Sequence, residues 1–574
     1  MNTLFRQFMM ALVLTFVVIG CADRAALQEP EAAEDSVSGA RGADEANAQV
    51  PAAEAPQEFG FLGKTAEGKA LQPTVMMRQV APSDATAWSD ADNETYNRIV
   101  ENAFKKAQDH PLSTFSIDVD AASYSNIRRI IREGRTPSKD AVRIEEMINY
   151  FVYDYPEPSG NRPFSITTEV GTAPWNPAHQ LVHVGLQGRR MQRDEQPANN
   201  LVFLLDVSGS MNAPDKLPLL KQAFSMLVGQ LTERDRVAIT VYAGAAGLVL
   251  PSTPGDQKET ILDALNRLQA GGSTAGAAGI RLAYQMAQEN FIDGGNNRVI
   301  LATDGDFNVG TSSDAELVRM IEEKRDSGTF LTVIGFGTGN LKDAKMEQIA
   351  DHGNGNYYYI DNELEARKVL VTDLRGTLFT IAKDVKIQIE FNPALVASYR
   401  LIGYENRLLA DEDFDDDTKD AGELGAGHTV TALYEIIPIG ATTDADVRDR
   451  GELKYQNSGL TQAAVASGEL MTLKLRYKAP DGDTSRLIER AVMNPSRSER
   501  ATGNNFYFSA AVAEFGMILR DSQHKSTATL DQVLALARDA QGDDAYGYRA
   551  EFIRLVEDYQ VLTGSGTPVS EVGR

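Results

Sequence analysis

The stretch at residues 201–210, LVFLLDVSGS, runs from five consecutive apolar residues into an aspartate and two serines. A short, uniformly apolar run of this kind is typical of a strand that is buried on both faces of a sheet. Apolar residues then recur at helical spacing through residues 217–231, and strand-like and helix-like runs alternate further along the chain. The expected strands are 237–242, 247–250, 299–302, 330–336 and 357–360, and the expected helices are 256–269, 276–291, 314–327, 343–351 and 362–380.

This alternation predicts a doubly wound α/β domain over residues 199–382, with a mostly parallel, six-stranded sheet that helices cover on both faces. The run at 247–250 follows the run at 237–242 too closely for a crossover helix. We therefore expect 247–250 to pair as an antiparallel edge strand.

Polar side chains stand where these strands end. Asp206, Ser208 and Ser210 follow the first strand, Thr274 precedes the helix at 276–291, and Asp304 follows the strand at 299–302. A doubly wound sheet brings such strand ends together where the strand order reverses, so we expect these side chains to converge. Carboxylate and hydroxyl oxygens suit Mg²⁺, Mn²⁺ or Ca²⁺ and not zinc, which prefers Cys and His. The sequence therefore predicts a site for a hard divalent cation.

With these residues in place, the sequence resembles the von Willebrand factor type A (VWA) family. Asp206, Ser208 and Ser210 match its DxSxS signature, Thr274 matches its separate threonine, and Asp304 matches the aspartate of its TDG motif. The resemblance implies a metal-ion-dependent adhesion site, in which the serines and the threonine tend to touch the metal and the aspartates often act through water. By the same analogy, the helix at 362–380 can slide and couple the metal to neighbouring domains.

Such a site performs recognition and not turnover. Mostly neutral ligands leave a divalent ion electron-poor, so a Glu or Asp from a protein partner can replace a bound water and complete its coordination. We expect Mg²⁺ as the cofactor, with Mn²⁺ and Ca²⁺ left open, and we expect no enzymatic activity. The alternative is a structural envelope or assembly factor in which the metal is secondary. Replacing Asp206 with Ala would abolish partner capture in the first case and be largely tolerated in the second.

The N-terminus has the pattern of a lipoprotein. Arg6 precedes an apolar run at residues 9–19, which is too short to span a bilayer core of about 30 Å but suits a signal peptide. The run ends in VIGC, where Cys21 is the only cysteine of the chain. This pattern resembles a bacterial lipobox, which implies a signal peptide at 1–20, lipidation of Cys21 and a stable membrane anchor. Ala22 stands where an Asp tends to retain lipoproteins at the inner membrane, which favours the outer membrane of a Gram-negative cell envelope.

Composition divides the rest of the chain. Residues 21–92 begin as an acidic stretch rich in Ala, Glu and Pro, with too few large apolar residues to offset the entropy of ordering, which predicts a disordered tether. We expect an N-terminal α/β flanking region with strands at 93–198, a β-rich domain at 383–500 and a C-terminal helical segment at 501–574. The net charge of −25 argues against a nucleic-acid partner, since nucleic-acid grooves need clustered Lys and Arg.

Within the flanking regions, helical periodicity is visible at 95–108 and strand-like sequence at 164–170 and 181–186. Alternation at period two returns at 385–391, 428–436 and 470–480, and helical patterns return at 506–519, 530–538 and 548–562. Both ends of the α/β domain thus meet strand-like sequence. We therefore expect the strands at 164–186 and 385–478 to build one β-sandwich into which the α/β domain is inserted.

Enzymatic motifs are weaker. Asp118-Val119-Asp120 resembles the DxD of haloacid-dehalogenase phosphatases, but a capped turn before a helix from Ser123 explains it better. Residues 335–339, GFGTG, are not a GxGxxG loop. His179 and His183 lie in a strand-like run without HExxH, and we interpret them as ordinary surface or core residues. The acidic run at 411–423 fits no EF-hand register and predicts a solvated loop.

Overall fold

A computed structural model describes residues 94–564, apart from 193–194, 273–275, 306–313, 339–340, 374–375, 377, 444, 446, 448–458 and 496–501. Cys21, the expected signal peptide and the expected tether therefore lie outside the described residues, and so does Thr274. In the described part of the chain, no helix has both the length and the apolar character needed to cross a membrane.

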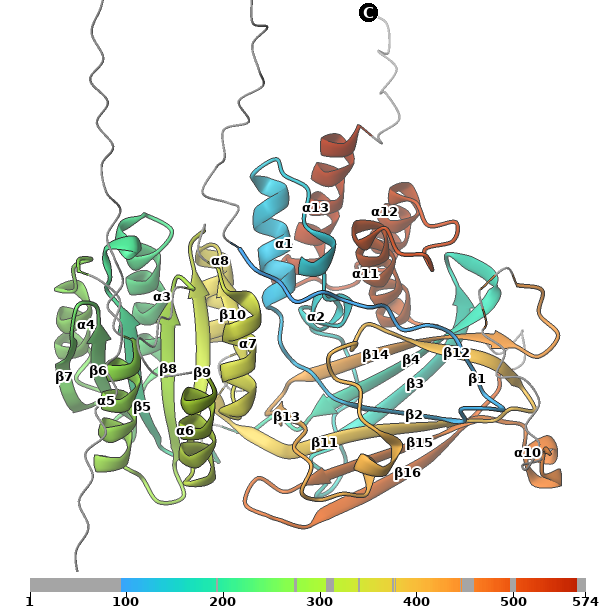
Figure 1. Ribbon diagram of the computed structural model, residues 1–574, viewed down its shortest axis with the longest axis horizontal. Helices are drawn as coiled ribbons and strands as arrows, with labels where there is room; N and C mark the ends of the chain where they lie inside the picture. Colours follow the sequence, from blue (N-terminus) through green and yellow to red (C-terminus); the bar gives the residue numbers. More distant parts are fainter. Residues whose placement is uncertain are drawn as a thin grey trace, which may run out of the picture. The chain divides into compact units, whose positions relative to one another are not determined.

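The α/β domain contains one six-stranded sheet in the order β10-β9-β8-β5-β6-β7 (Figure 1). β5 pairs in parallel with both β6 and β8, while β7 pairs antiparallel with β6, as the short spacing predicted. The expected doubly wound fold class is therefore confirmed. The strands are β5 (Asn199–Asp206), β6 (Arg236–Tyr242), β7 (Ala246–Pro254), β8 (Asn296–Thr303), β9 (Thr329–Phe336) and β10 (Tyr357–Ile360).

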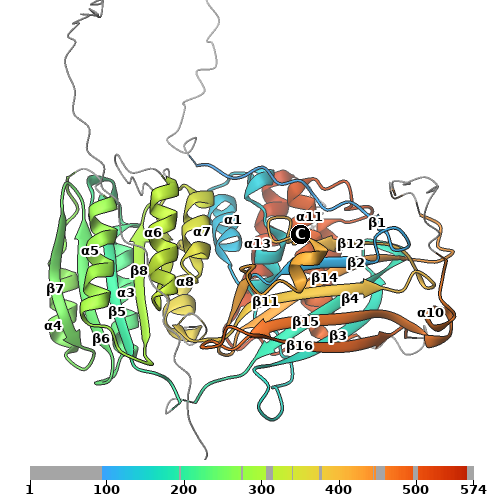
Figure 2. The ribbon, with the colours of Figure 1, turned by 60° about the horizontal axis from the view of Figure 1, so that its bottom comes forward.

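Helices cover both faces of this sheet because successive side chains of a strand point to opposite sides. Phe203 of β5 packs with Phe224 of α3 on one face, whereas Leu204 packs with Ile280 of α5 on the other. Figure 2 shows α5 and α6 on the near face. The helices are α3 (Leu217–Gln230), α4 (Lys258–Asn266), α5 (Gly276–Glu289), α6 (Asp314–Asp326), α7 (Asp343–His352) and α8 (Glu363–Arg367), followed by the π-helical turn η4 (Lys368–Thr372).

Two antiparallel sheets form the β-rich part. One has the order β1-β12-β14-β4-β3, and the other has the order β13-β11-β15-β16 with β2 also paired to β11. Apolar residues of both sheets, such as Val184, Val430, Ile387 and Leu473, share one core. The strands are β1 (Lys105–Lys106), β2 (Leu112–Ser116), β3 (Phe164–Ala173), β4 (Asn176–Gly188), β11 (Thr380–Phe391), β12 (Val396–Ile402), β13 (Gly422–Gly425), β14 (Thr429–Pro438), β15 (Glu469–Lys478) and β16 (Ser485–Met493).

These pairings join sequence from both sides of the α/β domain. β4, which precedes it, pairs with β14, and β2 pairs with β11, which follows it. The α/β domain is thus inserted between strands of one β-sandwich, as expected from the strand-like sequence at both of its ends.

A cluster of helices covers the outer face of the first antiparallel sheet, where Leu181 and Leu433 contact Phe506 and other helical residues (Figure 1). The three C-terminal helices match the predicted segments closely. The helices are α1 (Ala122–Arg132), α2 (Ile144–Asn149), α11 (Asn504–Arg520), α12 (Leu530–Asp539) and α13 (Tyr548–Thr563); the shorter elements elsewhere are η2 (Lys139–Ala141), η3 (Gly209–Asn212), η5 (Asp411–Phe414) and α10 (Gln462–Ser467).

One expected helix is wrong, and another is interrupted. Residues 95–104 form no helix, because the Ile99 amide donates to Asp140 and the Asn102 side chain donates to the carbonyls of Leu401 and Gly403, which hold the segment against distant elements. The helix expected at 362–380 is helical through α8 and η4 as far as Thr372 and bends at Asp373, although residues 376 and 378 are again helical. Beyond it Gly376 passes so close to the His428 ring that a Cβ there would lie 1.9 Å from it, and β11 begins at residue 380.

Candidate metal centre

Asp206 is the last residue of β5, at the point where the strand order of the sheet reverses. Its side chain is fully buried, and its Oδ1 accepts a hydrogen bond of 2.8 Å from the Ser208 amide. Its Oδ2 accepts one of 3.3 Å from the hydroxyl of Thr303, the last residue of the neighbouring β8. The carboxylate is therefore held in one orientation by groups from two adjacent strands.

The two serines follow in the turn that leads to η3. The Oγ atoms of Ser208 and Ser210 lie 3.0 Å apart, with Ser208 buried and Ser210 exposed. The loop before α5 is tied to this turn, because Gly209 donates to the Gly272 carbonyl and Gly271 donates to the Val207 carbonyl. Gly271 and Gly272 therefore lie beside this turn, whereas Thr274 is outside the described residues.

Asp304 directly follows β8 and is fully buried. Its Oδ2 accepts a hydrogen bond of 2.9 Å from the Nζ of Lys216, which is itself buried. The two aspartates are close enough for the charge of Asp304 to contribute to raising the pKa of Asp206. Burial is the main cause of that raised pKa, and hydrogen bonds from Ser208 oppose it.

The residues fit a hard divalent cation. Two carboxylates and two hydroxyls meet at one sheet edge, and the exposed Ser210 opens the group to solvent. Among the described residues, no three His, Cys, Asp or Glu side chains gather around one point, so a metal here would depend on hydroxyl oxygens as well. Such a set supplies hard oxygen ligands, of which only the two carboxylates carry charge.

Lys216 is a residue that the sequence interpretation missed. It lies between η3 and α3, and its partner Asp304 is 88 residues further along the chain. The available signal was a lysine in the loop that joins the DxSxS turn to the first helix of the domain.

The end of the domain is fixed to the flanking helices by buried charges. Arg128 of α1 donates through Nε to Asp361 over 3.0 Å, through Nη2 to Glu365 of α8 over 2.8 Å, and through Nη1 to Glu551 of α13 over 3.0 Å. Its side chain is only 1% exposed. Tyr150 donates to Glu365 and accepts from Arg128, which completes the cluster. The sequence interpretation did not single out this cluster.

The aspartate and histidine motifs considered in the sequence take part in structural contacts. Asp118 accepts from the amide of Asp120 within a turn, and both carboxylates contact Arg407. The expected capped turn is confirmed by this hydrogen bond, but no side chain caps α1 itself, because the residue that precedes the helix is Ala121. His179 and His183 are both buried.

The expected solvated loop at 411–423 is corrected in part. It begins with η5, and its last residues enter β13. Lys386 donates to the Asp413 carbonyl and Lys478 donates to the Asp417 carbonyl, so basic side chains of the chain itself hold the segment.

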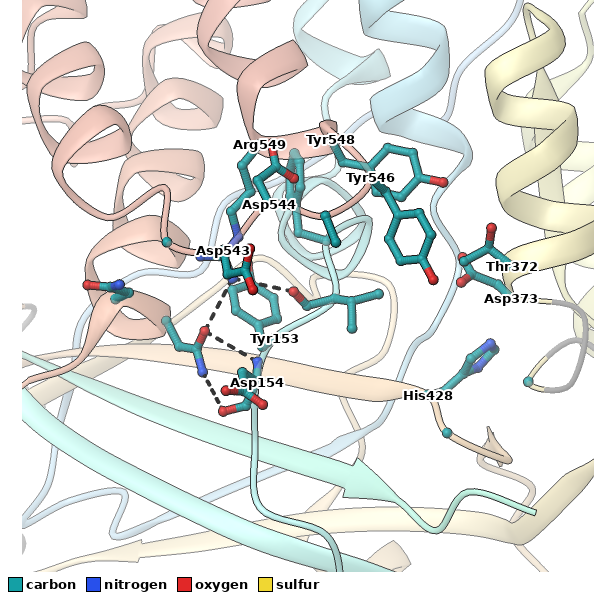
Figure 3. A pocket seen from close by; sticks show the side chains of 18 of the residues that line it. Tyr153, Asp154, Thr372, Asp373, His428, Asp543, Asp544, Tyr546, Tyr548 and Arg549 are labelled. Carbon is teal, nitrogen blue, oxygen red and sulfur yellow. Dashed lines mark hydrogen bonds between the residues drawn. The ribbon is translucent and has the colours of Figure 1, made fainter. Parts of the chain in front are cut away.

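Apart from the candidate metal centre, a hollow of about 990 Å³ lies between the β-sandwich, the helices and the exit from the α/β domain (Figure 3). Arg549 in its wall donates to the Ala540 carbonyl and to Asn505, and its guanidinium lies 4.5 Å from the centre of the Phe508 ring. Burial lowers the pKa of His428 to about 4, so this ring is neutral at pH 7. No serine or cysteine is among the described lining residues, so they offer no Ser–His or Cys–His pair.

Comparison with known proteins finds matches to three family models along the chain. Residues 200–372 match the von Willebrand factor type A domain model, residues 90–183 match a model described as von Willebrand factor, and residues 376–562 match the model of the C-terminal region of the uncharacterized protein YfbK. The VWA match points to a protein-interaction or adhesion module.

Among relatives, the uncharacterized protein YfbK of Escherichia coli (strain K12) is 42% identical over 494 residues, which cover 85% of this chain and 84% of YfbK. The uncharacterized protein sll0103 of Synechocystis sp. is 28% identical over 33% of this chain and 44% of its own length. A solved von Willebrand factor type A structure from Catenulispora acidiphila is 16% identical and covers 68% of this chain and 90% of its own, with a TM-score of 0.38. Because its identity to YfbK extends over most of both chains, the protein belongs to the YfbK family and carries a VWA domain within it.

Proposed function

We propose that this protein is an envelope-anchored binding protein, and not an enzyme, whose VWA domain recognises its partner through a divalent cation. Asp206, Ser208, Ser210, Thr274 and Asp304 would hold the ion, with Mg²⁺ the first candidate and Mn²⁺ or Ca²⁺ open. The observation that carries the proposal is the convergence of Asp206, the two serines and Asp304 at the point where the strand order reverses.

The metal would supply a Lewis-acidic centre at the surface of the domain. The protein's own residues would leave it electron-poor, because the hydroxyls of Ser208 and Ser210 carry no charge. The exposure of Ser210 leaves one side of the site open to solvent. A Glu or Asp side chain of a protein partner is the ligand that such a position favours, since it gains a charge-assisted bond in a partly dry site.

The test is calorimetric titration of Mg²⁺, Mn²⁺ and Ca²⁺ into the chelator-stripped full chain. Asp206→Asn is the informative variant, because the amide oxygen can still accept from the Ser208 amide while the charge is lost. Asp263→Asn, which removes an exposed carboxylate from α4, is the matched control. One binding event that Asp206→Asn removes and Asp263→Asn retains supports the site. Equal binding by all three proteins, with circular dichroism showing each folded, refutes it.

A structural role is the second candidate, and the buried Arg128 cluster favours it, because this cluster fixes the VWA domain to both flanking regions. In that case the Asp206→Asn protein would capture the same envelope partners as the wild type in a cross-linking pull-down. Loss of those partners from Asp206→Asn, but not from Asp263→Asn, favours metal-dependent recognition instead.

Membrane attachment would come from acyl chains on Cys21, with the outer membrane favoured. Two or more acyl chains suffice for stable anchoring. Cys21→Ser should move the protein from the membrane fraction to the soluble fraction and abolish incorporation of labelled palmitate. Unchanged fractionation and labelling would refute the lipid anchor.

A further inference from the structure

The Lys216 side chain is buried next to the candidate metal ligands. The residue directly precedes α3, and its side chain is 7% exposed. Its Nζ lies 2.9 Å from Oδ2 of Asp304, whose side chain is wholly buried. A buried carboxylate is costly without a countercharge, so the ammonium stabilises Asp304 where it stands.

The path of the lysine stem is fixed by a glycine. Gly337, directly after β9, has φ of +71°, and a Cβ on it would lie 2.2 Å from Cγ of Lys216. The Gly337 carbonyl also accepts a hydrogen bond of 2.6 Å from the Tyr359 hydroxyl, which holds this turn in place. The absence of a side chain at 337 therefore lets the stem of Lys216 cross the turn and place its ammonium on Asp304.

We infer that Lys216 is a tethered cation: its ammonium is the countercharge of Asp304 in the metal-free protein and moves away from this carboxylate when a divalent ion binds. The inference rests on the proposed function. A metal ion held by Asp206 and Asp304 would repel an ammonium that lies within hydrogen-bond distance of the same carboxylate. Metal binding and the Lys216–Asp304 contact therefore exclude each other, and the energy of breaking the contact weakens metal affinity.

The first test follows the accessibility of Lys216 in the wild-type full chain. Reductive dimethylation read out by peptide mass spectrometry should modify Lys216 slowly without metal, and at least about fivefold faster with saturating Mg²⁺, as the contact with Asp304 opens. Lys258 of α4, a half-buried lysine whose Nζ donates to the Gly229 carbonyl and lies away from the candidate site, serves as the internal reference and should react at one rate throughout. A Lys216 rate that Mg²⁺ binding leaves unchanged overturns the inference.

The second test compares Lys216→Met with Lys258→Met by calorimetric Mg²⁺ titration. Methionine keeps an unbranched stem that can cross Gly337 but lacks the charge. Lys216→Met should lower the Kd for Mg²⁺ by about tenfold or more, and Lys258→Met should leave it unchanged. Mg²⁺ should also raise the melting temperature of Lys216→Met more than that of the wild type, because the metal then supplies the missing countercharge.

The outcomes separate the two proposals. If the wild type and Lys216→Met bind Mg²⁺ equally well, the tethered-cation inference is wrong while the metal site stands. If neither binds Mg²⁺, Mn²⁺ or Ca²⁺, the proposed function fails and the inference fails with it. Should Lys216→Met prove too unstable to titrate, the labelling of the wild type decides.

Discussion

Replacing Arg128 with Met should destabilise the protein strongly. The guanidinium is 1% exposed and contacts the carboxylates of Asp361, Glu365 and Glu551. Methionine fills part of the same space but leaves these carboxylates without their shared countercharge. Breaking a buried ion pair by removing one partner costs about 3–5 kcal/mol, which is the expected loss in the free energy of unfolding.

Two features of the structure set limits on this loss. Glu551 keeps a second ion pair, at 2.7 Å, with Arg132, which reduces the cost. Burial raises the pKa of Glu365, so this carboxyl can take up a proton once Arg128 is gone. The destabilisation should therefore be larger at pH 8 than at pH 5, because protonation removes one of the uncompensated charges at the lower pH.

Urea unfolding followed by tryptophan fluorescence measures the effect, since Trp175 is buried in the cluster of flanking helices. Arg132→Met is the matched control. It lies on the same helix and contacts the same Glu551, but its side chain is 44% exposed, so its loss should cost at most about 1 kcal/mol. Equal and small losses for Arg128→Met and Arg132→Met would show that Arg128 is solvated in solution, and would refute the claim that it fixes the VWA domain to its flanks.

Three further predictions concern pH and packing. Burial raises the pKa of Glu514 from 4.5 to about 8, so the stability that its protonated form contributes is present below pH 4.5 and is lost as the pH rises towards 8. Glu514→Gln should therefore remove a slope of about 1.4 kcal/mol per pH unit from the free energy of unfolding measured between those pH values. Burial lowers the pKa of His183 from 6.5 to about 3, so its contribution is present above pH 6.5 and is lost as the pH falls; His183→Phe should flatten acid unfolding below pH 6.5, and an unchanged slope would contradict the burial of this ring. Phe224→Ala should cost about 3–5 kcal/mol in urea unfolding, because the ring packs on Phe203 with centroids 4.7 Å apart inside the core of the VWA domain; a loss below about 1 kcal/mol would contradict that packing.

The VWA domain was predictable because its signals are local. Apolar strands and amphipathic helices alternate within short windows, and the polar residues that end β5 and β8 identify the sheet edge where a ligand can bind. The contacts between the charged side chains of the site are not local. Lys216 meets Asp304 from 88 residues away, and no periodicity links the two.

In the flanking regions, too, contacts between residues that are distant in sequence decide the local structure. Helical spacing at 95–108 suggested a helix, yet Asn102 donates to carbonyls 299 and 301 residues away and the segment forms no helix. Here tertiary hydrogen bonds override local propensity. The burial and the ion pairs of Arg128 could not be predicted either, because an arginine within an amphipathic helix is usually solvated. Its carboxylate partners come from two distant parts of the chain.

The edge of the sheet that carries the candidate metal site also leads to the flanking helix α1. β8, β9 and β10 are adjacent and parallel, so the residues that follow them line one edge. Along that edge the Lys216 stem crosses Gly337, the Gly337 carbonyl accepts from the Tyr359 hydroxyl, and the Arg129 guanidinium of α1 lies 5.7 Å from the centre of the Tyr359 ring. The displacement of Lys216 that we propose would therefore act on residues that already contact α1. The contact between the VWA domain and its flank is accordingly part of the surroundings of the candidate metal site, and the two should be perturbed and measured together.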